Sequence, residues 1–204
     1  MKSLIIKSLE NSYSYKSYRE YLSELLSQGL SSGNTQSEEL NHYSTLNQVR
    51  MNRLDKTITI DKSIKQTLEK LTKKHIWLVI SEGWCGDAAQ IVPVLNKMAE
   101  ASCGNIDLRI VLRDKNELLM NKFLTNGAKS IPKVIVINKE SLEIEATWGP
   151  RPEGAANVIN NFKQQFGQIT AEAKTELQKW YLNDKGLQIQ QELISTMDIA
   201  KEVL

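Results

Sequence analysis

The sequence has few of the residues from which proteins build metal sites and disulfide frameworks. It contains two cysteines, Cys85 and Cys103, and two histidines, His42 and His75. A structural zinc site needs four ligands in recognisable spacings, and no such spacing occurs here. Two cysteines are also too few for the disulfide framework of a small secreted domain. We therefore expect neither a protein-built metal site nor a cofactor.

The sequence also lacks an excess of charge of one sign and a long apolar run. Lys and Arg number 26 against 24 Asp and Glu, so the formal net charge of +2 predicts no nucleic-acid or acidic-membrane partner. The apolar run near Met1 is only three residues long, Leu4 to Ile6. A secretory signal needs roughly 7–15 apolar residues and a membrane span about 20. We expect a cytoplasmic protein, whose thiols are kept reduced.

What the sequence does contain is typical of a folded globular protein. Of its 204 residues, 41% are hydrophobic and 25% are charged, with charges of both signs. Its patterns predict one compact unit of three parts: a helical N-terminal extension over 1–59, a central domain over 60–167 and a helical tail over 168–204. Apolar residues at helical spacing, such as Tyr18 and Leu22, predict the flanking helices.

The central part alternates between strand and helix patterns. The apolar run over 76–80 predicts a buried strand, and the alternation over 106–112 predicts a second one. A helical stretch between them makes a parallel crossover. The later patterns are a short helix over 115–124, a strand pair over 134–137 and 144–148, and a helix with Ala155 and Ile159 on one face. The sequence therefore predicts an α/β fold with a mixed sheet flanked by helices.

One segment stands out chemically, because Cys85 follows the first strand and opens a helix. Unpaired N–H groups and the helix dipole stabilise an anion at a helix start, and such positions lower the pKa of a thiol. The neighbouring Asp87 opposes this effect, since a like charge raises a thiol pKa. We therefore expect a moderately acidic Cys85. The alternative is that Cys85 is a buried structural thiol.

Several motifs in this order resemble the thioredoxin superfamily. They are Trp84-Cys85-Gly86 at the junction of strand and helix, Pro93 within the helix, Ile131-Pro132 before a strand, and Trp148 to Pro152. The resemblance is to a bacterial branch with a Trp-Cys-Gly-Asp motif, and its core covers about 60–167. It implies a thioredoxin-like fold.

The resemblance also implies roles for individual residues. Cys85 is similar to the family's nucleophilic thiol, and Pro132 to its cis-proline beside the thiol. The backbone at Ile131 would then hydrogen-bond an extended peptide, Gly149 would leave room for a substrate, and Trp84 would shield the sulfur. The implied substrate-binding residues are Trp84, Gly86, Asp87, Ile131, Pro132 and Gly149.

The sequence departs from the dithiol motif, because Ala88 stands where a resolving cysteine would be. A mixed disulfide at Cys85 then has no internal thiol to release it. Cys103 is too far away, about 27 Å along a helix at 1.5 Å per residue. Two functions follow. The first is monothiol exchange, in which the partner of Cys85 is a protein or peptide thiol or disulfide, or glutathione, and an external thiol resolves the mixed disulfide. The second is a redox-inactive module that binds a peptide or protein. The intact motif narrowly favours exchange, and a homo-oligomer is compatible with either.

Three other polar residues have simpler interpretations. Glu82 is expected to be a solvated loop charge, and His75 a residue at the end of a strand. Arg151 is expected to serve packing or to start a helix, with lining of a partner groove as the alternative. None of the three is assigned to the catalytic site.

Overall fold

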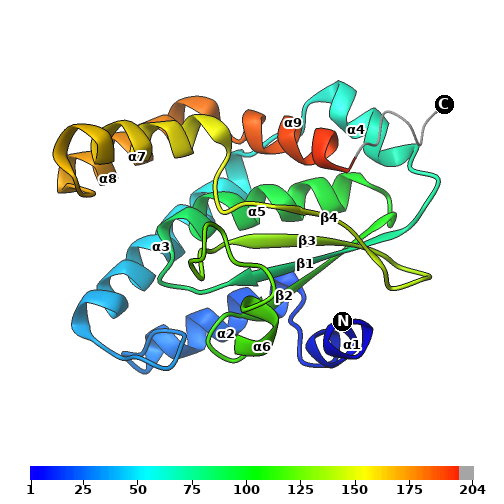
Figure 1. The fold of residues 1–204 in the computed structure, drawn as a ribbon, viewed down its shortest axis with the longest axis horizontal. Coiled ribbons are helices and arrows are strands. Elements are labelled where there is room, and N and C mark those ends of the chain that lie inside the picture. The colour runs from blue at the N-terminus through cyan, green and yellow to red at the C-terminus, as the bar shows by residue number, and fades with distance from the viewer. Residues whose placement is uncertain (198–204) are drawn as a thin grey trace.

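The computed structural model describes residues 1–197, in which a four-stranded sheet lies between two groups of helices (Figure 1). The strands are β1 (His75–Ser81), β2 (Ile106–Leu112), β3 (Lys133–Asn138) and β4 (Ile144–Trp148), in the spatial order β2-β1-β3-β4. Strand β1 is parallel to β2 and antiparallel to β3, and β4 is antiparallel to β3. The α/β class and the mixed sheet are therefore confirmed.

Helices make up much of the remaining described chain. Those before the sheet are α1 (Lys2–Glu10), α2 (Tyr15–Ser27), α3 (Glu38–Thr57) and α4 (Lys62–Glu69). Those within and after it are α5 (Gly86–Ala101), α6 (Glu117–Met120), α7 (Glu153–Phe166), α8 (Ala171–Asp184) and α9 (Leu187–Thr196). Helix α1 was not predicted, and α6 is shorter than the helix expected over 115–124. The expected helical tail extends past α9, and its residues 198–204 lie outside the described part of the chain.

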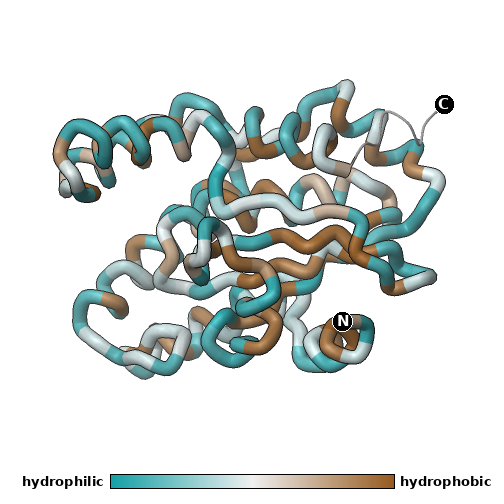
Figure 2. Tube along the Cα trace, in the orientation of Figure 1, coloured by the Kyte–Doolittle hydropathy of each residue, from teal (hydrophilic) through white to brown (hydrophobic). Residues whose placement is uncertain are grey.

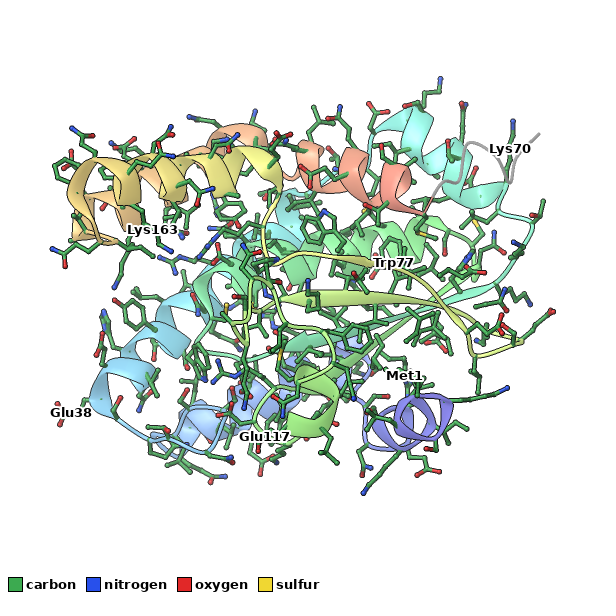
Figure 3. The ribbon with its side chains drawn as sticks, viewed as in Figure 1. Met1, Glu38, Lys70, Trp77, Glu117 and Lys163 are labelled. Atoms are coloured by element: carbon green, nitrogen blue, oxygen red, sulfur yellow. The ribbon has the colours of Figure 1, made fainter. Side chains whose placement is uncertain are left out.

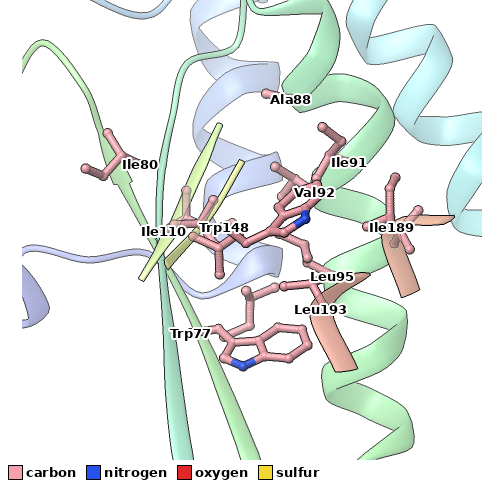
Figure 4. Packing of buried hydrophobic residues seen from close by; sticks show 14 of the residues in the cluster. Trp77, Ile80, Ala88, Ile91, Val92, Leu95, Ile110, Trp148, Ile189 and Leu193 are labelled. Carbon is pink, nitrogen blue, oxygen red and sulfur yellow. The ribbon is translucent and has the colours of Figure 1, made fainter. Parts of the chain in front are cut away.

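Strand β1 is the centre of the core, as its uninterrupted apolar run predicts. All seven of its residues are buried, because helices cover both faces of the sheet. In Figure 1, α5 and α9 lie on one side of the sheet, and α1 and α2 lie on the other. Trp77 and Trp148 lie in the packed layer that includes Leu95 of α5 and Leu193 of α9 (Figure 4). Hydrophobic colour is accordingly concentrated in the central strands (Figure 2).

The fold brings three helices to the end of the sheet where β1 leads into α5. Helix α3 packs along α5, and the α7–α8 pair extends from the same end of the molecule (Figure 1). The start of α5 is thus flanked by the N-terminal extension and by the C-terminal tail. Among residues 1–197, no helix combines the length and the apolar content needed to cross a bilayer.

Candidate functional site

Cys85 is the N-cap residue of α5, at the position that the sequence pattern predicts. Its extended backbone turns the sulfur toward the first helical turn, where the Ala88 amide donates to Sγ at 3.5 Å. The thiol itself donates to the carbonyl oxygen of Ile131 at 3.4 Å. Only 8% of Cys85 is exposed. The sulfur therefore lies at the base of the site, in contact with the loop that precedes β3.

The loop against the thiol contains a cis peptide bond between Ile131 and Pro132. Gly149 lies behind this loop with a φ of +105°, and a Cβ there would come within 2.5 Å of the Pro132 carbonyl oxygen. Both the backbone conformation and the close approach require glycine. The space that its missing side chain leaves is occupied by Pro132 and is not open to a substrate. Gly149 thus permits two loops to pack together.

Asp87 is held by two partners from distant parts of the chain. Its carboxylate makes an ion pair with Arg151 at 2.6 Å and accepts a hydrogen bond from the Tyr181 hydroxyl at 2.9 Å. Burial, together with the Asp87 charge, raises the pKa of Tyr181 well above its ordinary value, so this hydroxyl remains a donor. The sequence patterns did not assign Arg151 or Tyr181 to the site, since their relation to Asp87 is purely tertiary.

The expectation of a moderately acidic Cys85 is wrong. Burial, and after it the negative charge of Asp87, raises the pKa of the Cys85 thiol to about 12. The amides of Ala88 and Asp87 and the charge of Arg151 act in the opposite direction but are outweighed. A position at a helix start does not reveal how far a side chain is buried. At neutral pH Cys85 is therefore a protonated thiol.

The expectation that Glu82 is a solvated loop charge is also wrong, because only 1% of Glu82 is exposed. Its carboxylate accepts hydrogen bonds from Ser32 Oγ at 2.5 Å and from the Asp114 amide at 3.0 Å. Ser32 Oγ in turn accepts from the Gly83 amide at 2.7 Å. Burial raises the pKa of Glu82. The N-terminal extension is thus bonded directly to the loop that carries Cys85.

A groove of about 830 Å³ opens beside Cys85. Its base includes five of the residues singled out in the sequence: Trp84, Cys85, Gly86, Asp87 and Ile131. Its walls come from α3 on one side and from α7 and α8 on the other, and side chains of these helices project into the space between them (Figure 3). Pro132 and Gly149 do not line this groove. Ligand sites commonly have this size and mixture of polar and apolar walls.

The groove walls also contain residues that sequence reasoning missed. Arg50 of α3 and Gln178 of α8 both face the first turn of α5. The sequence shows Arg50 only as one of two arginines on the polar side of a helix. No periodic pattern distinguishes it from Arg53, which is exposed.

Cys103 and His75, the other cysteine and the histidine discussed in the sequence, lie away from the groove. Cys103 is exposed beyond the opposite end of α5, and both cysteines are free. His75 begins β1, as expected, and its Nε2 lies 2.9 Å from Glu145. Among residues 1–197, no three His, Cys, Asp or Glu side chains are grouped as a metal site would require.

The fold and this site define a thioredoxin-like protein with a single thiol in its motif. Residues 33–174 match the model of a family described as Thioredoxin, and this span is more than half of the chain. The chain therefore belongs to this thioredoxin family. No curated protein matches the sequence.

Two solved structures share the fold at low sequence identity. An HIV epitope-scaffold superimposes with a TM-score of 0.56 and 18% identity, covering 93% of this chain and 98% of that one. A protein of unknown function from Pseudomonas aeruginosa has a TM-score of 0.50 and 17% identity, covering 88% of this chain and 99% of that one. At such identities the likeness concerns the fold alone.

Proposed function

We propose that this protein is a thioredoxin-fold binding module that holds an extended peptide in the groove beside Ile131. The observation that carries the proposal is the state of Cys85, a buried thiol that donates to the Ile131 carbonyl at 3.4 Å at the base of an open groove. A thiol held in the protonated form is a poor nucleophile, whereas the groove around it is accessible. Ala88 also leaves Cys85 without a resolving partner in the motif.

The proposal also covers the branch of the thioredoxin family to which the protein belongs and the cell compartment in which it works. We place the chain in the bacterial branch with a Trp-Cys-Gly-Asp motif, on the basis of Trp84 to Asp87. We place it in the cytoplasm, where free thiols such as Cys85 and Cys103 remain reduced. Its partner is a protein or peptide.

The second candidate function is monothiol exchange, which the position of Cys85 at the helix start favours. The Cys85 thiolate would attack one sulfur of a substrate disulfide, and the other sulfur would leave as a thiolate. The resulting mixed disulfide would be attacked at the substrate sulfur by an external thiol such as glutathione. This second step restores the Cys85 thiolate and releases the substrate as a mixed disulfide with the external thiol. Arg151 lowers the pKa of Cys85 and would assist the first step.

One experiment separates the two functions. Full-length protein carrying Cys103→Ser, which removes the exposed thiol, is incubated with oxidised glutathione at pH 7.0 and its intact mass is measured. The binding module predicts no glutathionyl adduct on Cys85 within an hour. A rapid adduct that reduced glutathione then removes would contradict the binding module and support exchange.

The peptide-binding half of the proposal has its own measurement. Acetylated and amidated five-residue peptides, in which alanine alternates with glutamate, glutamine or lysine, are titrated into the full-length protein by calorimetry. At least one of the three peptides is expected to bind. Failure of all three peptides to bind would contradict the proposed function.

A further inference from the structure

The groove beside Cys85 has an excess of positive charge that the composition of the chain does not predict. The whole sequence has a net charge of only +2. The groove is lined by five cationic side chains and a single carboxylate, Asp87. The five are Arg50, Arg113, Lys129, Arg151 and Lys174. Clefts lined by one sign of charge attract ligands of the other sign.

Three of these cations are already balanced by carboxylates. The ion pairs are Arg113–Asp114, Lys129–Glu117 and Arg151–Asp87. The other two, Arg50 and Lys174, make no ion pair with any carboxylate of residues 1–197. Arg50 comes from α3 and Lys174 from α8, and Lys174 Nζ reaches toward α3, where it donates to the Tyr43 hydroxyl at 3.2 Å.

Arg50 is held in place by neutral groups. Its Nη1 donates to Asn47 Oδ1 at 2.7 Å, and Asn47 Nδ2 donates to the Gly83 carbonyl at 2.9 Å. The guanidinium is thereby tied to the loop that carries Cys85. Partial burial, and the nearby charge of Arg53, lower the pKa of Arg50. Keeping this group charged therefore costs free energy, which a bound anion would offset.

Two hydrogen-bond donors converge on the open face of Gly86, next to Cys85. A methyl group on Gly86 would lie 3.8 Å from Arg50 Nη1 and 3.9 Å from Gln178 Nε2. Gln178 Oε1 accepts from Gln90 Nε2 at 2.7 Å, which orients the Gln178 amide. The first turn of α5 adds its partial positive charge to the same space. Carboxylates are suited to such donors, since charge-assisted hydrogen bonds are the stronger ones.

We propose that the ligand of this groove is an acidic peptide, one of whose carboxylates binds over Gly86 between Arg50 and Gln178. The inference rests on the proposed peptide-binding function and names the chemistry of its ligand. Lys174, whose Nζ donates to the neutral Tyr43 hydroxyl at 3.2 Å, interacts with a second acidic residue. The apolar walls, which include the accessible side chains of Leu40 and Ile169, pack against the aliphatic parts of the peptide.

The test compares three capped pentapeptides that differ only in charge. Alanine alternates with glutamate, glutamine or lysine, and each peptide is titrated into full-length protein by calorimetry at 50 mM salt. The glutamate peptide is expected to bind at least tenfold more tightly than the glutamine peptide. Raising the salt to 500 mM should weaken the binding of the glutamate peptide severalfold and leave that of the glutamine peptide nearly unchanged. This measurement needs no variant.

A matched pair of variants then tests the assigned cation. Arg50→Gln is expected to weaken binding of the glutamate peptide about tenfold and to leave the glutamine peptide within twofold. Arg53→Gln removes the same charge from the same helix at an exposed position. It is expected to change neither affinity by more than twofold. Circular dichroism and thermal unfolding establish that both variants are folded.

The outcomes separate this inference from the function on which it rests. If the glutamate and glutamine peptides bind wild-type protein equally, the acidic ligand is wrong while peptide binding stands. If Arg50→Gln and Arg53→Gln weaken binding equally, the attraction is general and the site over Gly86 is wrong. If no peptide binds, the proposed function itself fails.

Discussion

The two cysteines, at opposite ends of helix α5, have contrasting environments. Cys85 caps the N-terminus, is 8% exposed and donates to the Ile131 carbonyl. Cys103 follows the C-terminus, is exposed, and has its Sγ 3.9 Å from Glu69 Oε1. The cysteine in the family motif is thus the less accessible of the two. The motif determines where the thiol lies in the fold, but burial and neighbouring charges determine whether it ionises.

The largest expected effect is the difference in alkylation between these two thiols. A thiol with a pKa of about 12 has roughly a thousandfold less thiolate at neutral pH than one at the ordinary value of 9.0. With iodoacetamide at pH 7.5, we expect Cys103 to react at least on the order of 1000-fold faster than Cys85, since burial also limits access. Peptide mass spectrometry over a time course measures both rates. Equal rates would contradict the environment described for Cys85.

Measuring the alkylation rate of Cys85 as a function of pH tests whether its pKa is raised or lowered. Because only the thiolate reacts, the rate at Cys85 should rise about tenfold for each pH unit and show no plateau below pH 10. A plateau near pH 8 would mean that the thiol is acidic, as the sequence alone suggested, and would favour the exchange function.

The next effect concerns how firmly the Cys85 end of α5 is held. Ser32→Ala removes the hydroxyl that donates to buried Glu82 and accepts from the Gly83 amide. Leaving a buried carboxylate oxygen and an amide without partners should lower the free energy of unfolding by about 2–3 kcal/mol. Urea denaturation measures the loss. Ser23→Ala on the exposed side of α2 is the control and should change stability by less than about 0.5 kcal/mol.

A Ser32→Ala variant as stable as wild type would contradict the bonding of the N-terminal extension to this loop. If the loss is observed, Cys85 should also be alkylated faster in the variant, because the loop is then held less firmly. Cys103, which lies beyond the other end of α5, should react at its usual rate.

The smallest of these effects isolates the contribution of Asp87. Asp87→Asn removes a negative charge that raises the Cys85 pKa and frees Arg151, whose charge lowers it. Both changes act in the same direction, so we expect alkylation of Cys85 at pH 8 to become roughly tenfold faster. Glu69→Gln, beside Cys103, is the matched control and should leave the rate at Cys85 unchanged. No change in Asp87→Asn would mean that burial alone sets the pKa.

Much of the fold could be predicted because its signals are local. The apolar run of β1, the alternation in β2 and the helix after Cys85 all appear at the expected places. Helix α1 was missed because its buried residues, Ile5 and Ser8, include one polar side chain and so show no apolar stripe. Its folding depends on contacts with α6 and β2, which lie far along the chain.

The site could be predicted only in part, because some of its contacts join residues that are far apart in the sequence. The local strand and helix patterns placed Cys85 at the start of α5, and the family resemblance implied that Ile131 lies beside it. The burial of Glu82 depends on Ser32, which is 50 residues away in the chain. No local pattern could indicate that hydrogen bond.

The sequence by itself determined the α/β class, the strand-to-helix junction and the single thiol at that junction. Hydrophobic periodicity and motif order specify these features, because both are patterns among residues that are close together in the sequence. Only the tertiary structure decided that this thiol is buried and protonated, and that Arg50, Gln178 and Lys174 surround a groove beside it. Those properties depend on desolvation and on charges brought together from α3 and α8, which are far apart in the chain.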